Sequence, residues 1–374
     1  MNNAVIAAYA RSPFQQAHKG EFTKVRPDDL LANVVSGLLE RSGVNKADIE
    51  DLICGCAFPE GEQGLNIARL IVFMSGLPNS VAGSTINRWC GSSMQAIHMA
   101  AGNIALGAGD AFICAGIESM SRVPMMGFNP MPNPQLFAQK PNTLMGMGDT
   151  AEVVANKYNI TRQAQEAFAV ASQLKAAIAQ KQGHFIDEIV VVNGISEDGC
   201  IRGETTTEAL AGLKPAFDVN GSVTAGTSSP LTDGASAVLV CSEQYAKDNK
   251  IEALARITAV AVSGCEPEIM GMGPVYATRK ALKRAGLTID DIDIIELNEA
   301  FASQSIACIN ELKLDPSKVN IDGGAIALGH PLGATGARIV GKVASLLKRE
   351  GKRYGLATQC VGGGQGIATI VEAL

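Results

Sequence analysis

The sequence predicts an α/β fold built from two similar halves. Residues 4–9 form a short apolar run typical of a buried strand. The segment 27–43 follows, with apolar residues spaced along one helix face between an opening proline and a closing glycine. A second proline-to-glycine helix is expected at 274–286, and RSGV at 41–44 matches RAGL at 284–287, an offset of 243 residues. Self-similarity at a fixed offset indicates an internal repeat.

Each predicted half continues with a glycine-rich turn, a helix and a strand. In the first half, Cys90 lies in the turn, and the helix and strand are expected at 92–106 and 111–115. In the second half, His330 lies in the turn, and a strand is expected at 354–358. Two such halves should pack around a pseudo-twofold axis, with Cys90 and His330 at equivalent helix N-termini. The alternative is two unrelated α/β segments that share turn residues by chance.

The region between the halves has a different composition. Its first part interleaves methionines with prolines, and Thr161 then begins a helix expected to run through Phe168, Ala171, Leu174 and Ile178. We interpret it as an inserted, flexible cover, although an irregular plug of the core would have a similar composition. The predicted domains are an N-terminal half (1–117 with 229–246), an inserted loop domain (118–228) and a C-terminal half (247–374).

Composition excludes several functional classes. The 374 residues are 47% apolar and 18% charged, which is typical of a globular protein. The net charge of −6 and the lack of a basic stripe argue against nucleic-acid binding. Nine cysteines without a Cys-x-x-Cys pair, and no recognisable signal, transit or peroxisomal sequence, indicate free thiols in a cytoplasmic protein. No apolar run reaches the ~20 residues of a transmembrane helix.

Three glycine-rich turns carry reactive side chains. Cys90 lies in NRWCGSS, where a loop becomes a helix, and the positive end of the helix dipole there favours a thiolate. His330 lies in GHPLGATG, and Cys360 lies in TQCVGGG. Two thiols and one imidazole form a plausible set for covalent catalysis. Taken one at a time, each has a structural alternative as a buried thiol or a core histidine.

These segments resemble the motifs of the thiolases, in the same order along the chain. The resemblance includes NEAF at 298–301 and CVGGGQG at 360–366, and it covers essentially the whole chain. Segments 204–206, 215–218 and 323–328 are similar to the degradative 3-ketoacyl-CoA thiolases of fatty-acid β-oxidation. The resemblance implies an αβαβα layered core with an inserted loop domain.

The resemblance also implies roles for single residues. Cys90 would be the acylated nucleophile, His330 its activating base and Cys360 the general acid and base. Asn298 would orient a water that forms one oxyanion hole with His330, and the N–H groups of Cys90 and Gly362 would form the other. Five residues would line or adjoin the pantetheine tunnel: Met147, Phe217, Ser229, Ala300 and Phe301.

The family's reaction uses coenzyme A as a cosubstrate, with no permanently bound cofactor and no metal. The resemblance further implies a homodimer or homotetramer, with a multifunctional hydratase/dehydrogenase subunit of a β-oxidation complex as a possible partner. Biosynthetic acetoacetyl-CoA thiolases usually carry histidine where this chain has Gly146, which favours longer 3-ketoacyl chains here.

Several alternatives stay open at this point. They are an acetoacetyl-CoA thiolase running condensation, a non-catalytic acyl-CoA carrier, a scaffold within a β-oxidation complex, and a decarboxylating ketoacyl synthase. The last usually has a second histidine or an asparagine where Cys360 stands.

Overall fold

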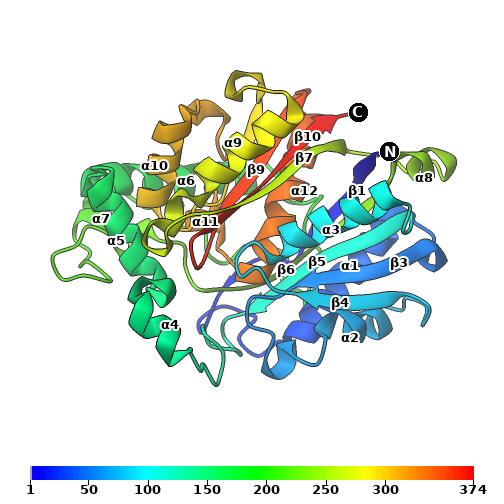
Figure 1. Ribbon diagram of the computed structural model, residues 1–374, viewed down its shortest axis with the longest axis horizontal. Coiled ribbons are helices and arrows are strands. Elements are labelled where there is room, and N and C mark those ends of the chain that lie inside the picture. Colours follow the sequence, from blue (N-terminus) through cyan, green and yellow to red (C-terminus); the bar gives the residue numbers. More distant parts are fainter. Residues whose placement is uncertain (1) are drawn as a thin grey trace.

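A single mixed sheet runs through the whole molecule. The computed structural model describes residues 2–374, and within them ten strands form a sheet in the order β4-β3-β5-β6-β1-β7-β10-β9-β8, with β2 paired to β6 (Figure 1). The strands are β1 (Ala4–Arg11), β2 (Gln15–Gln16), β3 (Ile49–Gly55), β4 (Ala82–Ile86), β5 (Ala111–Ser119), β6 (Thr232–Ser242), β7 (Ala255–Gly264), β8 (Ile294–Leu297), β9 (Tyr354–Val361) and β10 (Gln365–Ala373).

Helices cover both faces of this sheet. They are α1 (Pro27–Ser42), α2 (Ile67–Met74), α3 (Ser92–Leu106), α4 (Pro134–Gln139), α5 (Met147–Lys157), α6 (Arg162–Lys181), α7 (Thr207–Ala211), α8 (Glu243–Asp248), α9 (Gly273–Ala285), α10 (Ala302–Leu312), α11 (Ala325–Leu328) and α12 (Leu332–Glu350).

The strand order confirms the predicted internal repeat. The run β3-β5-β6-β1 in the first half corresponds to β8-β9-β10-β7 in the second, with one parallel pair followed by antiparallel pairs in both. The two runs meet where β1 and β7 pair antiparallel through Val5 with Arg256 and Ile6 with Ala255. The helices α1 and α9 both end at a glycine in the left-handed conformation, Gly43 and Gly286, a backbone that glycine adopts without a Cβ penalty.

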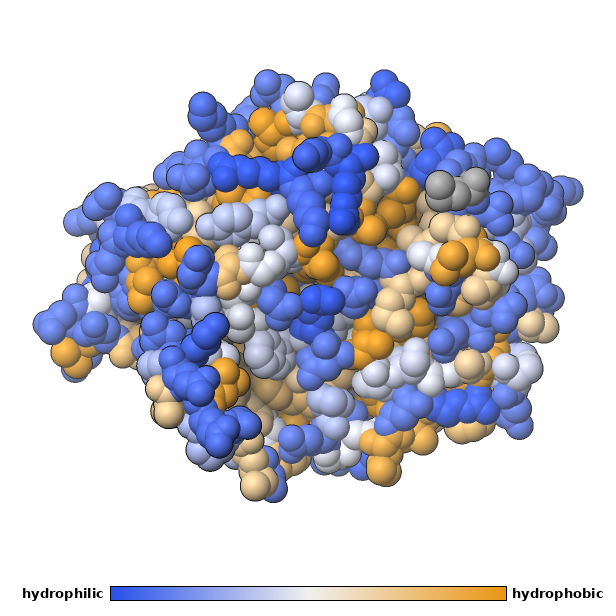
Figure 2. Space-filling view, viewed as in Figure 1, coloured by the Kyte–Doolittle hydropathy of each residue, from blue (hydrophilic) through white to orange (hydrophobic). Residues whose placement is uncertain are grey.

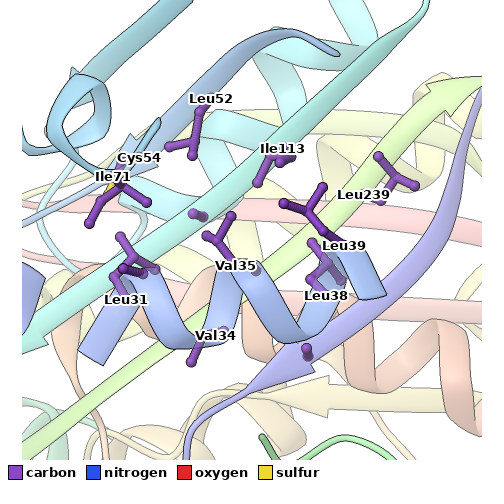
Figure 3. Packing of buried hydrophobic residues seen from close by; sticks show 14 of the residues in the cluster. Leu31, Val34, Val35, Leu38, Leu39, Leu52, Cys54, Ile71, Ile113 and Leu239 are labelled. Carbon is purple, nitrogen blue, oxygen red and sulfur yellow. The ribbon is translucent and has the colours of Figure 1, made fainter. Parts of the chain in front are cut away.

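Five layers follow from the way the helices pack, so the αβαβα core is also confirmed. The helices α1 and α2 cover the outer face of the first run of strands, and α9 and α10 cover the outer face of the second. The helices α3 and α12 pack against each other between the two runs. Figure 3 shows the outer layer, where Leu31, Val35 and Leu39 of α1 form one apolar cluster with Cys54, Ile113 and Leu239 of the strands.

One local expectation is confirmed and one is wrong. The helix α6 begins after its Thr161 cap and runs through Leu174 and Ile178 as predicted, and these two side chains are about half exposed, at 51% and 46%. Its buried face carries alanines, Ser172 and longer polar side chains such as Gln173, and it packs against α11. Cys360 was expected in a turn, but it lies within β9, and the glycine turn begins two residues later.

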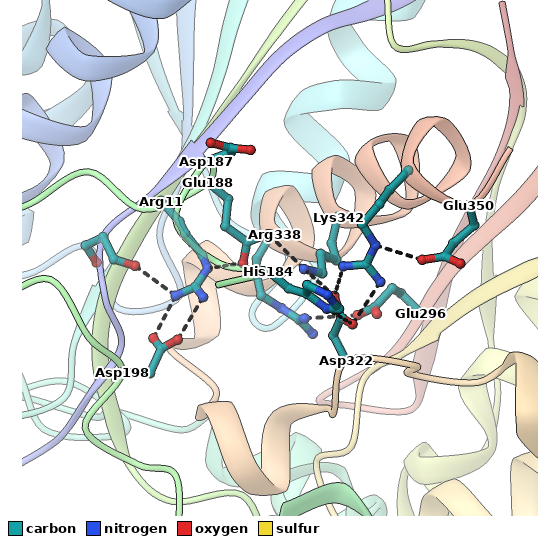
Figure 4. A network of polar contacts seen from close by, with 12 residues as sticks. Arg11, His184, Asp187, Glu188, Asp198, Glu296, Asp322, Arg338, Lys342 and Glu350 are labelled. Atoms are coloured by element: carbon teal, nitrogen blue, oxygen red, sulfur yellow. Dashed lines mark hydrogen bonds and ion pairs between the residues drawn. The ribbon is translucent and has the colours of Figure 1, made fainter. Parts of the chain in front are cut away.

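A buried network of charged side chains joins the region between the halves to the core (Figure 4). Arg11 on β1 donates to both carboxylate oxygens of Asp198, at 2.7 and 2.8 Å, and to Glu188 at 2.8 Å. Lys342 on α12 lies 3.0 Å from Glu188 and 2.8 Å from Asp322. These side chains are almost fully enclosed, so the pairing offsets the cost of burying their charges.

One face of the molecule shows a mainly polar surface (Figure 2). On the face drawn in Figure 2, most projecting side chains are hydrophilic, and apolar ones show in smaller patches between them. No helix among residues 2–374 is long and apolar enough to cross a membrane.

Candidate active site

Cys90 lies in the turn between β4 and α3. Gly91 caps the helix, and Cys90 is 8% exposed. The preceding Trp89 adopts a left-handed backbone (φ +42°), and its N–H donates to Asn87 Oδ1 at 2.7 Å. The hydroxyl of Ser92 donates to the Trp89 carbonyl at 2.6 Å. These bonds hold a tight turn that presents the Cys90 thiol at the start of α3.

His330 occupies the equivalent turn before α12. Its backbone N–H donates to Thr232 Oγ1 at 3.0 Å, and its ring Nδ1 lies 2.6 Å from Thr335 Oγ1. The single Thr335 hydroxyl proton is donated to the Pro331 carbonyl at 3.0 Å, so the Nδ1 atom of His330 must be the donor to Thr335. The other ring nitrogen, Nε2, then carries a lone pair and lies 3.4 Å from Asn298 Nδ2. This tautomer can accept a proton at Nε2.

Cys360 and the glycine turn after β9 contact the Cys90 turn directly. The side chain of Gln359 donates to the Cys90 carbonyl oxygen. Gly363 and Gly364 both have positive φ (73° and 79°), which lets the backbone reverse immediately into β10. Cys360 is 1% exposed.

One cavity of about 240 Å³ is lined by Cys90, His330 and Cys360 together. The structure therefore brings side chains from three distant segments to a common space. The same cavity is lined by all five residues expected along the pantetheine tunnel: Met147, Phe217, Ser229, Ala300 and Phe301.

The remaining two predicted residues adjoin this cavity. Asn298 is fully buried beside His330, and its Oδ1 has no hydrogen-bond partner among the described residues. The backbone N–H groups of Gly362 and Cys90 both act on the Cys90 sulfur, where they favour its charged form. They are therefore in position to bind negative charge next to that sulfur.

The walls of the cavity are set by close packing in the inserted region. The Phe217 and Phe301 rings meet edge to face with centroids 5.9 Å apart. A Cβ at Gly148 would lie 2.1 Å from the Phe217 ring, so a glycine is needed there for this approach. The N–H of Ser229 donates to the Ala300 carbonyl at 3.0 Å, which fixes the opposite wall.

The thiols are not pre-ionised in the free protein, which corrects the expectation from the helix N-terminus. Burial raises the pKa of Cys90 to about 11, against the opposing effect of the Gly362 and Cys90 N–H groups. Burial and then the nearby Cys90 raise the pKa of Cys360 well above its usual value. Burial, with a smaller effect of Arg338, lowers the pKa of His330 to about 3. The resting cavity thus holds neutral thiols and a neutral imidazole.

Glu118 is a site residue that the sequence reasoning missed. Its buried carboxylate accepts the N–H groups of Ala57 (2.8 Å) and Gly333 (2.9 Å) and the side chain of Gln63 (2.9 Å). Gly333 lies in the first turn of α12, so Glu118 at the end of β5 fixes the helix that follows His330. The signal was present as a lone acidic residue at the end of an apolar strand.

Several apolar lining residues were also not singled out. They are Met270, Leu231 and Leu332, together with Met120 and Met125 of the methionine-rich segment. No group of three metal-ligating side chains is found within the part of the chain that the structure describes.

The fold and the cavity define an α/β protein of two repeated halves with two cysteines and a histidine in one enclosed site. Covalent acyl transfer through a thiol is chemistry that such a site can perform. Family models for the thiolase N-terminal and C-terminal domains match residues 4–244 and 251–373. The chain belongs to the thiolase family.

Curated relatives match over the full length of this chain. Proteins named 3-ketoacyl-CoA thiolase from Bacillus subtilis and Aliivibrio fischeri are both 47% identical, with all of each chain covered. The crystal structure of human mitochondrial 3-ketoacyl-CoA thiolase in complex with CoA superposes with a TM-score of 0.92 at 36% identity. That match covers 100% of this chain and 98% of the human one.

Proposed function

We propose that this protein is a 3-ketoacyl-CoA thiolase, an acyltransferase that cleaves 3-ketoacyl-CoA with free CoA into acetyl-CoA and a shortened acyl-CoA. The observation that carries this proposal is the single cavity lined by Cys90, His330 and Cys360. The full-length relatives of the same name support it. Coenzyme A is a cosubstrate in this reaction, and no permanently bound cofactor takes part.

In the first half-reaction, His330 Nε2 takes the Cys90 proton as the sulfur attacks the C3 carbonyl. The bond between C2 and C3 then breaks, and Cys360 gives its proton to C2 of the departing enolate. The products are acetyl-CoA and an acyl thioester on Cys90. The N–H groups of Cys90 and Gly362 bind the oxygen that becomes charged at C3, while Asn298 and His330 serve the thioester oxygen through a water.

In the second half-reaction, the Cys360 thiolate deprotonates the thiol of an incoming CoA. The CoA sulfur attacks the acyl carbon, Cys90 leaves, and it recovers its proton from His330. Cys90 and Cys360 are therefore both neutral thiols again, and His330 is again an unprotonated imidazole. Because both thiols start neutral, substrate binding has to precede proton transfer, which limits side reactions of a free thiolate.

The test is a product assay with 3-ketohexanoyl-CoA. We expect acetyl-CoA and butanoyl-CoA in equal amounts, formed only when free CoA is added. Cys360→Ala should lower kcat/KM by about 10²- to 10⁴-fold, the range for loss of a general acid and base. The matched control is Cys265→Ala. Cys265 is half-buried, and it lines neither this cavity nor the smaller cavity of about 90 Å³ beside Cys90.

The outcomes separate the alternatives. Binding without products would indicate an acyl-CoA carrier or a scaffold. Full activity of Cys360→Ala would contradict the assignment of Cys360, and activity confined to acetoacetyl-CoA would favour the acetoacetyl-CoA thiolase.

We further propose a cytoplasmic enzyme that assembles as a homodimer or homotetramer and that can join a multifunctional hydratase/dehydrogenase subunit. The proposed loop domain, residues 118–228, covers the cavity between an N-terminal half (1–117 with 229–246) and a C-terminal half (247–374). The family resemblance supports the assembly, and the cysteine composition supports the compartment. The division into domains is supported by Met147 and Phe217, which come from the loop domain and line the cavity.

A further inference from the structure

A second, smaller cavity opens beside Cys90. It measures about 90 Å³ and shares Cys90, Met125, Met147 and Leu332 with the larger cavity, but neither His330 nor Cys360 lines it. Its remaining lining is almost entirely apolar, with Phe58, Trp89, Met126 and Leu144 prominent. We propose that this cavity holds the acyl chain carried on Cys90 and that Trp89 is the residue that limits the chain's length. The inference rests on the proposed thiolase function and names the residue that selects among its substrates.

The two cavities divide the substrate by chemistry. The larger cavity holds the imidazole and the second thiol, and it must receive the pantetheine thiol of the incoming CoA. An acyl group on Cys90 with its carbonyl oxygen at the Gly362 N–H therefore has to direct its tail elsewhere. The smaller cavity starts at the same sulfur and the same glycine, and its apolar walls match a hydrocarbon chain.

The Trp89 ring is held firmly as a wall of this cavity. A Cβ at Gly362 or Gly363 would lie 2.8 or 2.5 Å from atoms of the indole ring, so the ring packs directly on the glycine turn. The Trp89 backbone is fixed in its left-handed conformation by Asn87 and Ser92. Moving the ring would disturb the turn that presents Gly362 to the acyl oxygen. The side chain is therefore a rigid boundary.

The opposite wall is adaptable. Met126 and Leu144 come from the methionine-rich segment, and Met126 is 47% exposed. Methionine side chains are unbranched and fill irregular space easily. This wall should accommodate chains of different length, so the indole ring sets the limit on the other side.

The experiment compares kcat/KM for linear 3-ketoacyl-CoA substrates of four to sixteen carbons in the native enzyme, Trp89→Ala and Phe137→Ala. Removing the indole should raise the ratio of kcat/KM for twelve carbons to that for four carbons by about tenfold or more, in line with the effect of methylenes in apolar pockets. Phe137 is exposed on α4 and lines neither cavity, so Phe137→Ala should leave the ratio unchanged.

A second variant guards against misfolding of Trp89→Ala. Trp89→Phe keeps an aromatic ring against the glycine turn but shortens it, so it should shift the ratio in the same direction by a smaller factor. If both variants cleave acetoacetyl-CoA with an unchanged chain-length profile, the inference is wrong. If the native enzyme cleaves no 3-ketoacyl-CoA, the proposed function itself has failed, which is a different result.

The chain contains a single tryptophan, which supplies an independent readout. Acylation of the native enzyme with 3-ketooctanoyl-CoA in the absence of free CoA should change the Trp89 emission more than acylation with acetoacetyl-CoA does. Equal changes with both substrates would mean that the chain does not lie against the ring.

Discussion

At the scale of single residues, the protonation states in the cavity decide how the enzyme starts its cycle. Burial raises the pKa of Cys90 to about 11 and lowers that of His330 to about 3. At neutral pH the proposed nucleophile, Cys90, is therefore a thiol, and the proposed base, His330, is an unprotonated imidazole whose Nε2 faces Asn298. The N–H groups that favour charge on the sulfur are in place, but they do not overcome desolvation on their own.

The first prediction concerns this resting thiol. In the free enzyme, the rate of Cys90 alkylation by iodoacetamide should rise about tenfold per pH unit from pH 7 to about pH 10, because only the thiolate reacts and its fraction grows with pH below its pKa. The measurement is mass spectrometry of the Cys90 peptide at timed intervals. A rate that levels off below about pH 8 would show that the thiolate is stabilised far more than the buried site allows.

The residues of this cavity could largely be named from the sequence, and their protonation could not. The turns around Cys90, His330 and Cys360 are marked by glycines whose backbone freedom the site needs. Burial, by contrast, comes from residues such as Met270 and Leu332, which no local pattern links to the cavity. The helix N-terminus at Cys90 suggested a thiolate, and enclosure by distant side chains reversed that expectation.

At the scale of elements, Glu118 connects the strand β5 of one half to the helix α12 of the other. All of its close partners are donors, including the N–H groups of Ala57 and Gly333 and the amide of Gln63. Burial raises the pKa of Glu118, and these donors oppose that rise. A carboxylate is an acceptor at both oxygens, so it suits this set of donors.

The second prediction is that Glu118→Gln destabilises the protein by about 2–3 kcal/mol, because its NH₂ group would face donors and leave buried groups unsatisfied. Urea unfolding followed by circular dichroism measures this loss, and kcat should fall as well because Gly333 follows His330 closely. Glu40→Gln on the exposed side of α1 is the control and should change little. Unchanged stability of Glu118→Gln would contradict the role of this contact.

The elements that the sequence located well are those with strong local signals. The helix α1 begins at a proline and ends at a left-handed glycine, and α3 spans the expected residues. The helix α6 also follows its Thr161 cap as predicted, but the sequence did not show that Leu174 and Ile178 would lie on its half-exposed side. Hydrophobic spacing alone does not show which face of a helix its neighbour in the fold, here α11, will cover.

At the scale of the whole molecule, the buried charge network joins segments that lie far apart in the sequence. Both carboxylate oxygens of Asp322 accept hydrogen bonds from the Arg349 guanidinium, at 2.6 and 2.9 Å. One of these oxygens also lies 2.8 Å from Lys342 Nζ. Although burial opposes it, the hydrogen bonds from Arg349 and the charge of Lys342 lower the pKa of Asp322 far below its usual value. The internal repeat could be read from the sequence, but these pairings depend on the complete fold and carry no sequence signal.

The third prediction follows from that lowered pKa. A carboxylate with a depressed folded-state pKa contributes stability above its unfolded pKa of about 3.9, and this contribution is lost as pH falls toward the folded value. Asp322→Asn should therefore lower the urea midpoint at pH 7 and weaken its decline between about pH 4 and pH 2. The exposed Asp290→Asn is the control. Parallel pH profiles for Asp322→Asn and the native protein would contradict the assignment.

The proposed reaction requires Cys90 to carry the acyl group, and direct detection of this acyl-enzyme tests the requirement. The native enzyme is mixed with 3-ketohexanoyl-CoA without free CoA. The reaction is stopped in acid, the protein is digested, and the mass of every cysteine peptide is measured by mass spectrometry. We expect one butanoyl group on the Cys90 peptide for each acetyl-CoA released, and its loss as butanoyl-CoA when CoA is added. Release of acetyl-CoA with Cys90 unmodified, or with the acyl group on another cysteine, would contradict it.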